Sequence, residues 1–291
     1  MSEDTGVWTY AITEDGHLSG PDGEVDLSWL TGVGETKVRT AASCGLTVLV
    51  SDVSLADFGE AALRENLENL DWLDEVAREH HYVIDAAARL FPLLPARLAT
   101  VYFGDAGVCA ALASRRERLR DTLRRVGGRV EWGVKAYATP EPGDAGTARR
   151  GSAGARAAGD PGPRTERTGT GGGETAGGET GGAGLAYLKR RRAQLSAGRD
   201  SRVAAAGGAQ TVHAELSGRA AAARLHPPQS PQLSGVRQPM LLNASYLLDA
   251  ANVVSFTEAV AGQATSHPEL RIELTGPWPP YSFADDNDDG H

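Results

Sequence analysis

The sequence predicts an α+β protein with two domains, and three observations lead to this prediction. The chain has 291 residues, which is long enough for two domains that each bury a hydrophobic core. Segments with the apolar period of a helix occur among segments of β-branched and aromatic residues that are typical of strands. Residues 140–184 contain no Leu, Ile, Val, Met, Phe, Tyr, Trp or Cys, and they separate two parts of ordinary globular composition.

The N-terminal part begins with three predicted strands. The first covers residues 7–12 and is followed by a turn-rich run at 13–23, in which Asp-Gly occurs twice. The next two strands, over residues 38–40 and 46–50, flank Ser43-Cys44-Gly45. This arrangement predicts a β-hairpin.

The most regular pattern in the chain follows this hairpin. Apolar side chains recur at three- and four-residue steps over residues 63–90, which predicts one long amphipathic helix. Pro92 and Pro95 end it, because proline has no amide donor and moves the preceding residue out of the helical region. A strand is then predicted over residues 97–103, and a second helix over residues 105–126 ends at two glycines.

The C-terminal part begins with a strand over residues 129–138, in which apolar residues alternate. Residues 140–184, in which GGET occurs twice, cannot offset a backbone ordering cost of roughly 1–2 kcal/mol per residue, so they are predicted to be a disordered, Gly-rich linker. A helix over residues 185–225 should break at Gly198 and at Gly207-Gly208.

Three further elements complete this part: a strand at 239–249, a helix at 253–264 and a strand at 270–275. The order strand, helix, strand, helix, strand predicts a ferredoxin-like domain. The predicted division is an N-terminal α+β domain at 1–127, a ferredoxin-like domain at 128–139 and 185–284, the linker at 140–184, and an acidic, frayed tail at 285–291.

Composition excludes several classes of partner and location. The net charge of −9 argues against nucleic acid and anionic membranes as main partners. The only cysteines, Cys44 and Cys109, form no CxxC motif and are expected to be buried thiols of a reduced, cytoplasmic protein. We expect no signal peptide, and no apolar run reaches the length of a membrane span.

Metal and phosphate sites are not predicted. His80-His81 with Asp85 lacks the His-Glu-x-x-His order of zinc proteases, and adjacent helical side chains point about 100° apart. These histidines are therefore expected to be solvated or to lie at a boundary. The sequence GGGETAGGETGG has no Gly-Lys-Ser/Thr and is interpreted as linker. No catalytic, cofactor-binding or metal-binding residue is expected.

Two basic helix faces and one aromatic motif are the candidate partner-binding residues. Arg116, Arg120 and Arg124 lie on one face, and Lys189 and Arg190 lie on another. Each face is either solvated or a docking surface for an acidic partner, whereas nucleic-acid binding would also need stacking aromatics.

The aromatic motif TGPWPPYSF combines three prolines with Trp278, Tyr281 and Phe283. Its rings either cap a core or hold a partner.

Six blocks in order along the chain resemble the gas vesicle protein F/L family. They are LENLDW at 67–72, LPARLATVY at 94–102, RVEWGVKAY at 129–137, AYLKRRR at 186–192, LNASYLL at 242–248 and ELTGPWPPYSF at 273–283. The Gly-rich insertion, the glycines of the C-terminal helix and the acidic tail depart from the family pattern.

The resemblance implies an N-terminal α+β domain and a C-terminal modified ferredoxin-like domain. Family members are minor components of the gas vesicle or of its assembly machinery, and no catalytic residues belong to the family. The resemblance thus implies a non-enzymatic accessory protein that binds the hydrophobic shell protein, limits its aggregation before nucleation and works with other accessory proteins. The alternatives are a small-ligand-binding or enzymatic ferredoxin-like protein and, with less support, a nucleic-acid-binding protein.

Overall fold

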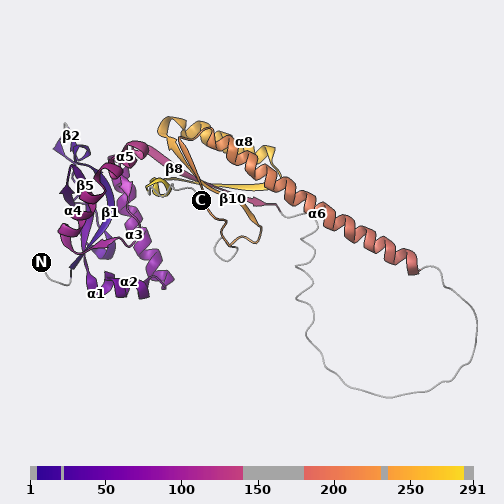
Figure 1. The fold of residues 1–291 in the computed structure, drawn as a ribbon, viewed down its shortest axis with the longest axis horizontal. Coiled ribbons are helices and arrows are strands. Elements are labelled where there is room, and N and C mark those ends of the chain that lie inside the picture. The colour runs from indigo at the N-terminus through magenta and orange to yellow at the C-terminus, as the bar shows by residue number, and fades with distance from the viewer. Residues whose placement is uncertain (1–4, 21–22, 140–179, 231–234, 285–291) are drawn as a thin grey trace, which may run out of the picture.

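The computed structural model describes residues 5–20, 23–139, 180–230 and 235–284. Figure 1 shows two halves side by side. The N-terminal half (residues 5–126) is a sheet with surrounding helices, and the C-terminal half (residues 129–284) is a second sheet with helices α6 and α8 on one face. The predicted domain boundary at 127–128 falls in the turn between them and stays a prediction.

The N-terminal sheet is antiparallel and has the strand order β4-β5-β1-β6, with β7 also paired to β1. Its strands are β1 (Thr5–Glu14), β4 (Arg39–Ser43), β5 (Leu46–Ser54), β6 (Leu94–Pro95) and β7 (Val101–Tyr102). The predicted hairpin is confirmed as β4-β5, whose two-residue turn places both Cys44 (φ 59°) and Gly45 (φ 78°) in the left-handed region.

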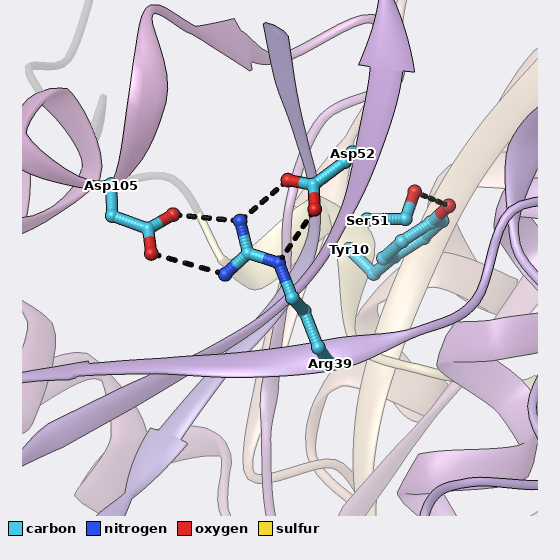
Figure 2. A network of polar contacts seen from close by, with 5 residues as sticks. All are labelled: Tyr10, Arg39, Ser51, Asp52 and Asp105. Atoms are coloured by element: carbon cyan, nitrogen blue, oxygen red, sulfur yellow. Dashed lines mark hydrogen bonds and ion pairs between the residues drawn. The ribbon is translucent and has the colours of Figure 1, made fainter. Parts of the chain in front are cut away.

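Short elements join these strands. They are the paired strands β2 (Ser19–Gly20) and β3 (Gly23–Glu24), and the 3₁₀ turns η1 (Asp15–His17) and η2 (Val33–Glu35). Tyr10 of β1 holds the turn η2 against the sheet. Its hydroxyl accepts a hydrogen bond from Val33 N at 2.8 Å. It also forms a hydrogen bond with Ser51 Oγ at 2.7 Å (Figure 2).

The predicted helix over residues 63–90 is wrong as a single element. Helices α1 (Leu55–Phe58) and α2 (Glu60–Asn66) precede α3 (Leu70–Ala88). The break occurs because Asn69 begins a new helix: its side-chain oxygen accepts from Asp71 N at 3.1 Å and from Trp72 N at 3.4 Å. Helix α3 then packs Val76, Val83, Ile84 and Ala87 against the sheet.

Two further predictions for the N-terminal half are wrong. The strand expected over residues 97–103 shortens to β7, because Ala99 has a φ of 61°, which a strand cannot accommodate. The helix expected over 105–126 is divided into α4 (Gly104–Ser114) and α5 (Arg116–Val126) by the non-helical backbone of Arg115. The break allows Arg116 Nε to donate to the carbonyl of Cys44 in the hairpin turn at 2.9 Å.

Helix α4 is tied to the sheet by one arginine. Figure 2 shows the guanidinium of Arg39, in β4, between the carboxylates of Asp52 in β5 and Asp105 in α4. Its Nη2 lies 2.5 Å from Asp52 and 2.8 Å from Asp105, and these two carboxylates raise the pKa of Arg39 further above its usual value. The contact therefore fixes α4 over the outer edge of the sheet.

The C-terminal half confirms the ferredoxin-like prediction. Its elements in chain order are β8 (Arg129–Ala138), α6 (Thr180–Ser217), β9 (Ala222–Leu225), β10 (Met240–Asp249), the 3₁₀ turn η4 (Ala250–Asn252), α8 (Val253–Ser266) and β11 (Leu270–Trp278). The antiparallel sheet has the order β11-β8-β10-β9, which is strands 4, 1, 3 and 2 of a βαββαβ unit. The predicted strands at 129–138, 239–249 and 270–275 and the helix at 253–264 are all present.

Helix α6 differs from its prediction in three ways. It runs without a break through Gly198, Gly207 and Gly208, it begins at Thr180, and the predicted helical residues 222–225 form β9, which pairs with β10. Only its last part packs on the sheet, through Ala205, Ala209, Val212 and Leu216, and Figure 1 shows its first part extending away from both halves. Residues 140–179 of the predicted linker and the predicted tail 285–291 lie outside the described residues.

Candidate functional site

The motif TGPWPPYSF lies where the two halves meet. After β11 the chain passes between them and forms the 3₁₀ turn η5 (Tyr281–Phe283). Phe283 is 5% exposed and packs in one cluster with Val7, Val48 and Leu123 of the N-terminal half and with Leu247 of the C-terminal half. The cluster thus contains residues of both sheets together with the buried Phe283 ring.

Polar contacts from both halves hold η5 in place. Glu131, on β8 and 6% exposed, accepts two hydrogen bonds from Ser282, one from the amide at 2.8 Å and one from the hydroxyl at 2.6 Å. Arg224, on β9, donates to the Ser282 carbonyl, and Arg125, on α5, donates to the Phe283 carbonyl at 3.2 Å. A buried carboxylate that accepts two hydrogen bonds is a strong anchor.

Serine, histidine and glutamate side chains meet near this anchor, and these residue types also form sites of nucleophilic catalysis. His226 Nε2 lies 2.9 Å from Ser245 Oγ, as a base and a nucleophile would. The glutamate of such a set has to orient the histidine, whereas the hydrogen bonds of Glu131 among the described residues are made to Ser282. The arrangement fastens the C-terminal segment and is not a catalytic triad.

The remaining rings of the motif contact helix α3. The Tyr281 hydroxyl lies 3.1 Å from His81 Nδ1, and the Trp278 ring packs edge-on against His81 with centroids 5.4 Å apart. Burial raises the pKa of Tyr281 well above its usual value, with smaller contributions from Asp85 and Glu131. Trp278 is still 43% exposed.

Trp278 borders a groove between the halves with a volume of about 540 Å³. Its other walls come from the end of α3, from the turn after it, which includes Leu90 at 50% exposure, and from Pro277, Pro279 and Pro280. The core-capping interpretation applies to part of the motif, and partner binding by its rings stays a prediction. Tyr281 and Phe283 close the junction, and Trp278 offers an accessible aromatic surface, so only Trp278 is available to a partner while the halves stay together.

The predicted basic residues do not form one surface. On α5, Arg116 and Arg120 donate to the Cys44 carbonyl, and Arg124 pairs with Asp121. Lys189 is exposed on the extending part of α6, far along the chain from α5, and the side chain of Arg190 lies outside the described residues. The two basic faces are therefore separate, and Arg116, Arg120 and Arg124 each contact a residue of their own half.

The adjacent histidines have different environments. His80 is 3% exposed, so the expectation of a solvated or boundary position is wrong for it. Its Nδ1 accepts from Trp8 Nε1 at 3.0 Å, and its Nε2 lies 3.2 Å from the Ala96 carbonyl, which requires a neutral ring that donates from Nε2. Burial lowers the pKa of His80 to about 4. His81 instead faces the junction.

The described part of the chain contains no group of three or more His, Cys, Asp or Glu side chains placed to hold a metal ion. The prediction that both cysteines are buried is wrong, because Cys44 is exposed in the hairpin turn and Cys109, on α4, is only half-buried. Within the same residues no helix combines the length and the apolar character that a bilayer crossing needs.

Sequence reasoning missed the residues that hold the motif: His81, Glu131, Arg125 and Arg224. Each lies far along the chain from η5; Glu131, for example, is 151 residues from Ser282. The alternation of residues 129–138 places Glu131 on the face opposite Val130 and Trp132, so the sequence gives no local signal of its burial.

Comparison with known proteins places this geometry in a family. The family model described as "Gas vesicle synthesis protein GvpL/GvpF" matches residues 6–285. Gas vesicle protein L of Streptomyces sp. (strain CB03234) is 39% identical over 287 residues, which cover 98% of this chain and 94% of that protein. Gas vesicle protein F1 of Halobacterium salinarum is 41% identical over 46 residues, or 16% of this chain and 22% of that protein.

Two crystal structures share the fold. The gas vesicle protein GvpF from Anabaena sp. PCC7120 superposes with a TM-score of 0.59 at 20% identity, with 99% of each chain covered. The GvpF from Microcystis aeruginosa gives a TM-score of 0.57 at 17% identity, with 96% of this chain and 99% of that chain covered. The family match over nearly the whole chain, the relative from Streptomyces and the shared fold agree with the resemblance of the six sequence blocks. This chain belongs to the GvpL/GvpF family of gas vesicle synthesis proteins.

Proposed function

We propose that this chain is a non-enzymatic accessory protein that binds the hydrophobic shell protein of the gas vesicle and assists nucleation and assembly. By covering apolar surface on the shell protein, it limits aggregation before the shell forms. It acts in the cytoplasm, associated with gas vesicles and with other gas vesicle accessory proteins. Family membership supports a role connected with gas vesicles, and the contact with the shell protein is our inference.

The observation that carries the proposal is the groove bordered by Trp278 and Leu90. Both side chains are large, apolar and about half exposed, and they face a hollow of about 540 Å³ between the halves. Prolines on both sides of Trp278 restrict its backbone, so little conformational entropy is lost when a partner packs on the ring. An aromatic anchor beside a groove is a common centre of binding energy for an apolar partner segment.

Charge supplies a second, weaker contact in this proposal. Lys189, exposed on the extending part of α6, meets acidic groups of the shell protein or of another accessory protein. The arginines Arg116, Arg120 and Arg124 contribute at the rim only, because each already contacts its own half. Those same contacts weaken the nucleic-acid alternative, which needs basic side chains directed at phosphates.

The test is retention of the purified shell protein and suppression of its light scattering by this chain. We expect Trp278→Ala and Leu90→Ser each to weaken retention at least fivefold and to shorten the period before the shell protein aggregates. Val254→Ser is the matched control, since Val254 is an exposed apolar residue (67%) on α8, and it should behave as the wild type.

Equal retention by all three variants and the wild type would exclude the groove as the contact surface. Circular dichroism of each variant shows whether its fold is kept.

A further inference from the structure

A second hollow, with a volume of about 380 Å³, is lined partly by Tyr281 and Ala284 of the C-terminal segment. Its inner wall is apolar and is formed by Ile12, Val48 and Leu94 of the N-terminal sheet together with Leu112 of α4. Three arginines line it as well: Arg97, Arg115 and Arg118. Among the described residues that line it there is no aspartate or glutamate, so the charge of this lining is positive.

The arginines come from two separate places in the chain, residue 97 and residues 115–118, and the local backbone brings them together. Arg97 follows β6 in the segment that turns at Ala99, whose φ is 61°. Arg115 is the non-helical residue between α4 and α5, and Arg118 lies in the first turn of α5. The Tyr102 hydroxyl, 3.5 Å from Arg115 Nη2, lies on the same wall. Arginines beside an apolar wall favour carboxylates, because the low-polarity wall screens the charge less than water does.

The C-terminal segment leads directly into this hollow. Tyr281 and Ala284 line it, and Ala284 is the last residue that the structure describes. The contacts of Ser282 with Glu131 and of the Phe283 carbonyl with Arg125 fix the segment up to that point. The sequence continues with Asp285-Asp286-Asn287-Asp288-Asp289, which brings four carboxylates within five residues.

Reach and charge both favour an intramolecular ligand. An extended chain advances about 3.5 Å per residue, so residues 285–289 span at most about 17 Å from a starting point on the wall of the hollow. A short tether of this kind gives an effective concentration in the millimolar range, which makes even a weak peptide site well occupied.

We propose that this basic hollow is a binding site for an acidic peptide and that residues 285–289 of the same chain occupy it. The acidic tail then pairs with arginines of the N-terminal half while it is covalently joined to the C-terminal half. It also blocks the site against acidic segments of other proteins. The proposal does not depend on the function proposed above.

The test uses the full chain with a neutral tail, carrying Asp285→Asn, Asp286→Asn, Asp288→Asn and Asp289→Asn. A fluorescent peptide with the sequence ADDNDDGH is titrated into this variant and into the wild type, and binding is followed by anisotropy. We expect the neutral-tail variant to bind the peptide at least tenfold more tightly than the wild type, in which the tail competes. Binding should weaken as salt is raised, because exposed ion pairs are screened.

Two controls test the assignment. The peptide ANNNNNGH should not bind either protein. In the neutral-tail background, Arg118→Glu should abolish peptide binding, whereas Arg64→Glu, at an exposed arginine of α2, should leave it unchanged.

Equal peptide binding by the wild type and the folded neutral-tail variant, or none by either, would overturn the proposal. So would equal binding of the uncharged peptide. Binding of inorganic phosphate without binding of the acidic peptide would assign the hollow to a free anion and would overturn it as well.

Discussion

At the scale of single residues, His80 illustrates what the sequence could and could not predict. The adjacent pair His80-His81 has no local feature that distinguishes its two members, so sequence reasoning gave both the same environment. The fold separates them by the 100° step of a helix: His80 points into the N-terminal core and accepts from Trp8, and His81 points to the junction. Burial of one residue in a pair depends on packing that only the tertiary structure determines.

The neutral ring of His80 predicts a loss of stability in acid. Its pKa of about 4 in the folded protein lies below its value of 6.5 when unfolded, so the unfolded chain binds more protons between these pH values. The contribution is present above pH 6.5 and is lost as the pH falls towards 4. From pH 7 to pH 5 this residue should remove about 2 kcal/mol from the free energy of unfolding.

Urea unfolding followed by circular dichroism at several pH values measures this effect. Burial also lowers the pKa of His213 and His226, so the wild type alone does not isolate His80. A His80→Gln variant keeps one acceptor and one donor and should be less stable than the wild type at pH 7. Between pH 7 and pH 5 its free energy of unfolding should fall by about 2 kcal/mol less than that of the wild type. If the free energy of unfolding of the variant fell as much with pH as that of the wild type, His80 would not titrate as proposed.

At the scale of elements, regular sequence periodicity predicted where helices and strands lie, but the ends of the helices could not be predicted from it. The alternation over residues 129–138 predicted β8 (Arg129–Ala138), and the apolar period over residues 63–90 located α3. The breaks before Asn69 and at Arg115 were missed because the apolar period continues through them. In α6 the error is the opposite one, since Gly207 and Gly208 suggested a break that the packing of the helix on the sheet prevents.

The two glycines of α6 should respond differently to alanine. A Cβ at Gly207 would meet nothing within 4 Å, so Gly207→Ala should raise the free energy of unfolding by up to about 1 kcal/mol through helix propensity. A Cβ at Gly208 would lie 2.6 Å from Glu269 Oε1 and 3.0 Å from His267 Nδ1. Gly208→Ala must therefore displace the hydrogen-bonded pair of His267 and Glu269 before β11 and should be destabilising.

The melting temperatures of the two variants and of the wild type measure this difference. Each variant is the matched control for the other. Gly207→Ala should melt above the wild type and Gly208→Ala below it. A higher melting temperature for both variants would mean that the close approach of α6 to the turn before β11 does not constrain position 208.

At the scale of the whole molecule, the two halves are joined by contacts that the sequence does not reveal. Each half could be predicted as an α+β unit from its own elements, because helix and strand patterns are local. The junction depends on pairs such as Arg125 with Phe283 and His81 with Tyr281, whose members lie 158 and 200 residues apart. The aromatic motif could be recognised as unusual, but its division into buried and exposed rings follows from where these distant partners lie.

That division predicts separate effects on stability and on binding. Phe283 is 5% exposed in a cluster drawn from both halves, so Phe283→Ala should leave a cavity and cost about 3–5 kcal/mol of unfolding free energy. Because the lost contacts are those between the halves, calorimetry should also show a broader transition or two transitions, since the halves no longer unfold together. Trp278, at 43% exposure, should cost less, roughly 2 kcal/mol, when replaced by alanine, since much of its surface is already in water.

The same two variants separate a structural role from a binding role. Trp278→Ala should keep the single calorimetric transition of the wild type and lose affinity for the shell protein. Phe283→Ala should weaken both properties, because it disturbs the walls that place Trp278 beside Leu90. If Phe283→Ala were no less stable than Trp278→Ala, the ring of Phe283 would not join the halves, and the groove would have to be held by the other contacts across the junction, such as those of His81 with Tyr281 and Trp278.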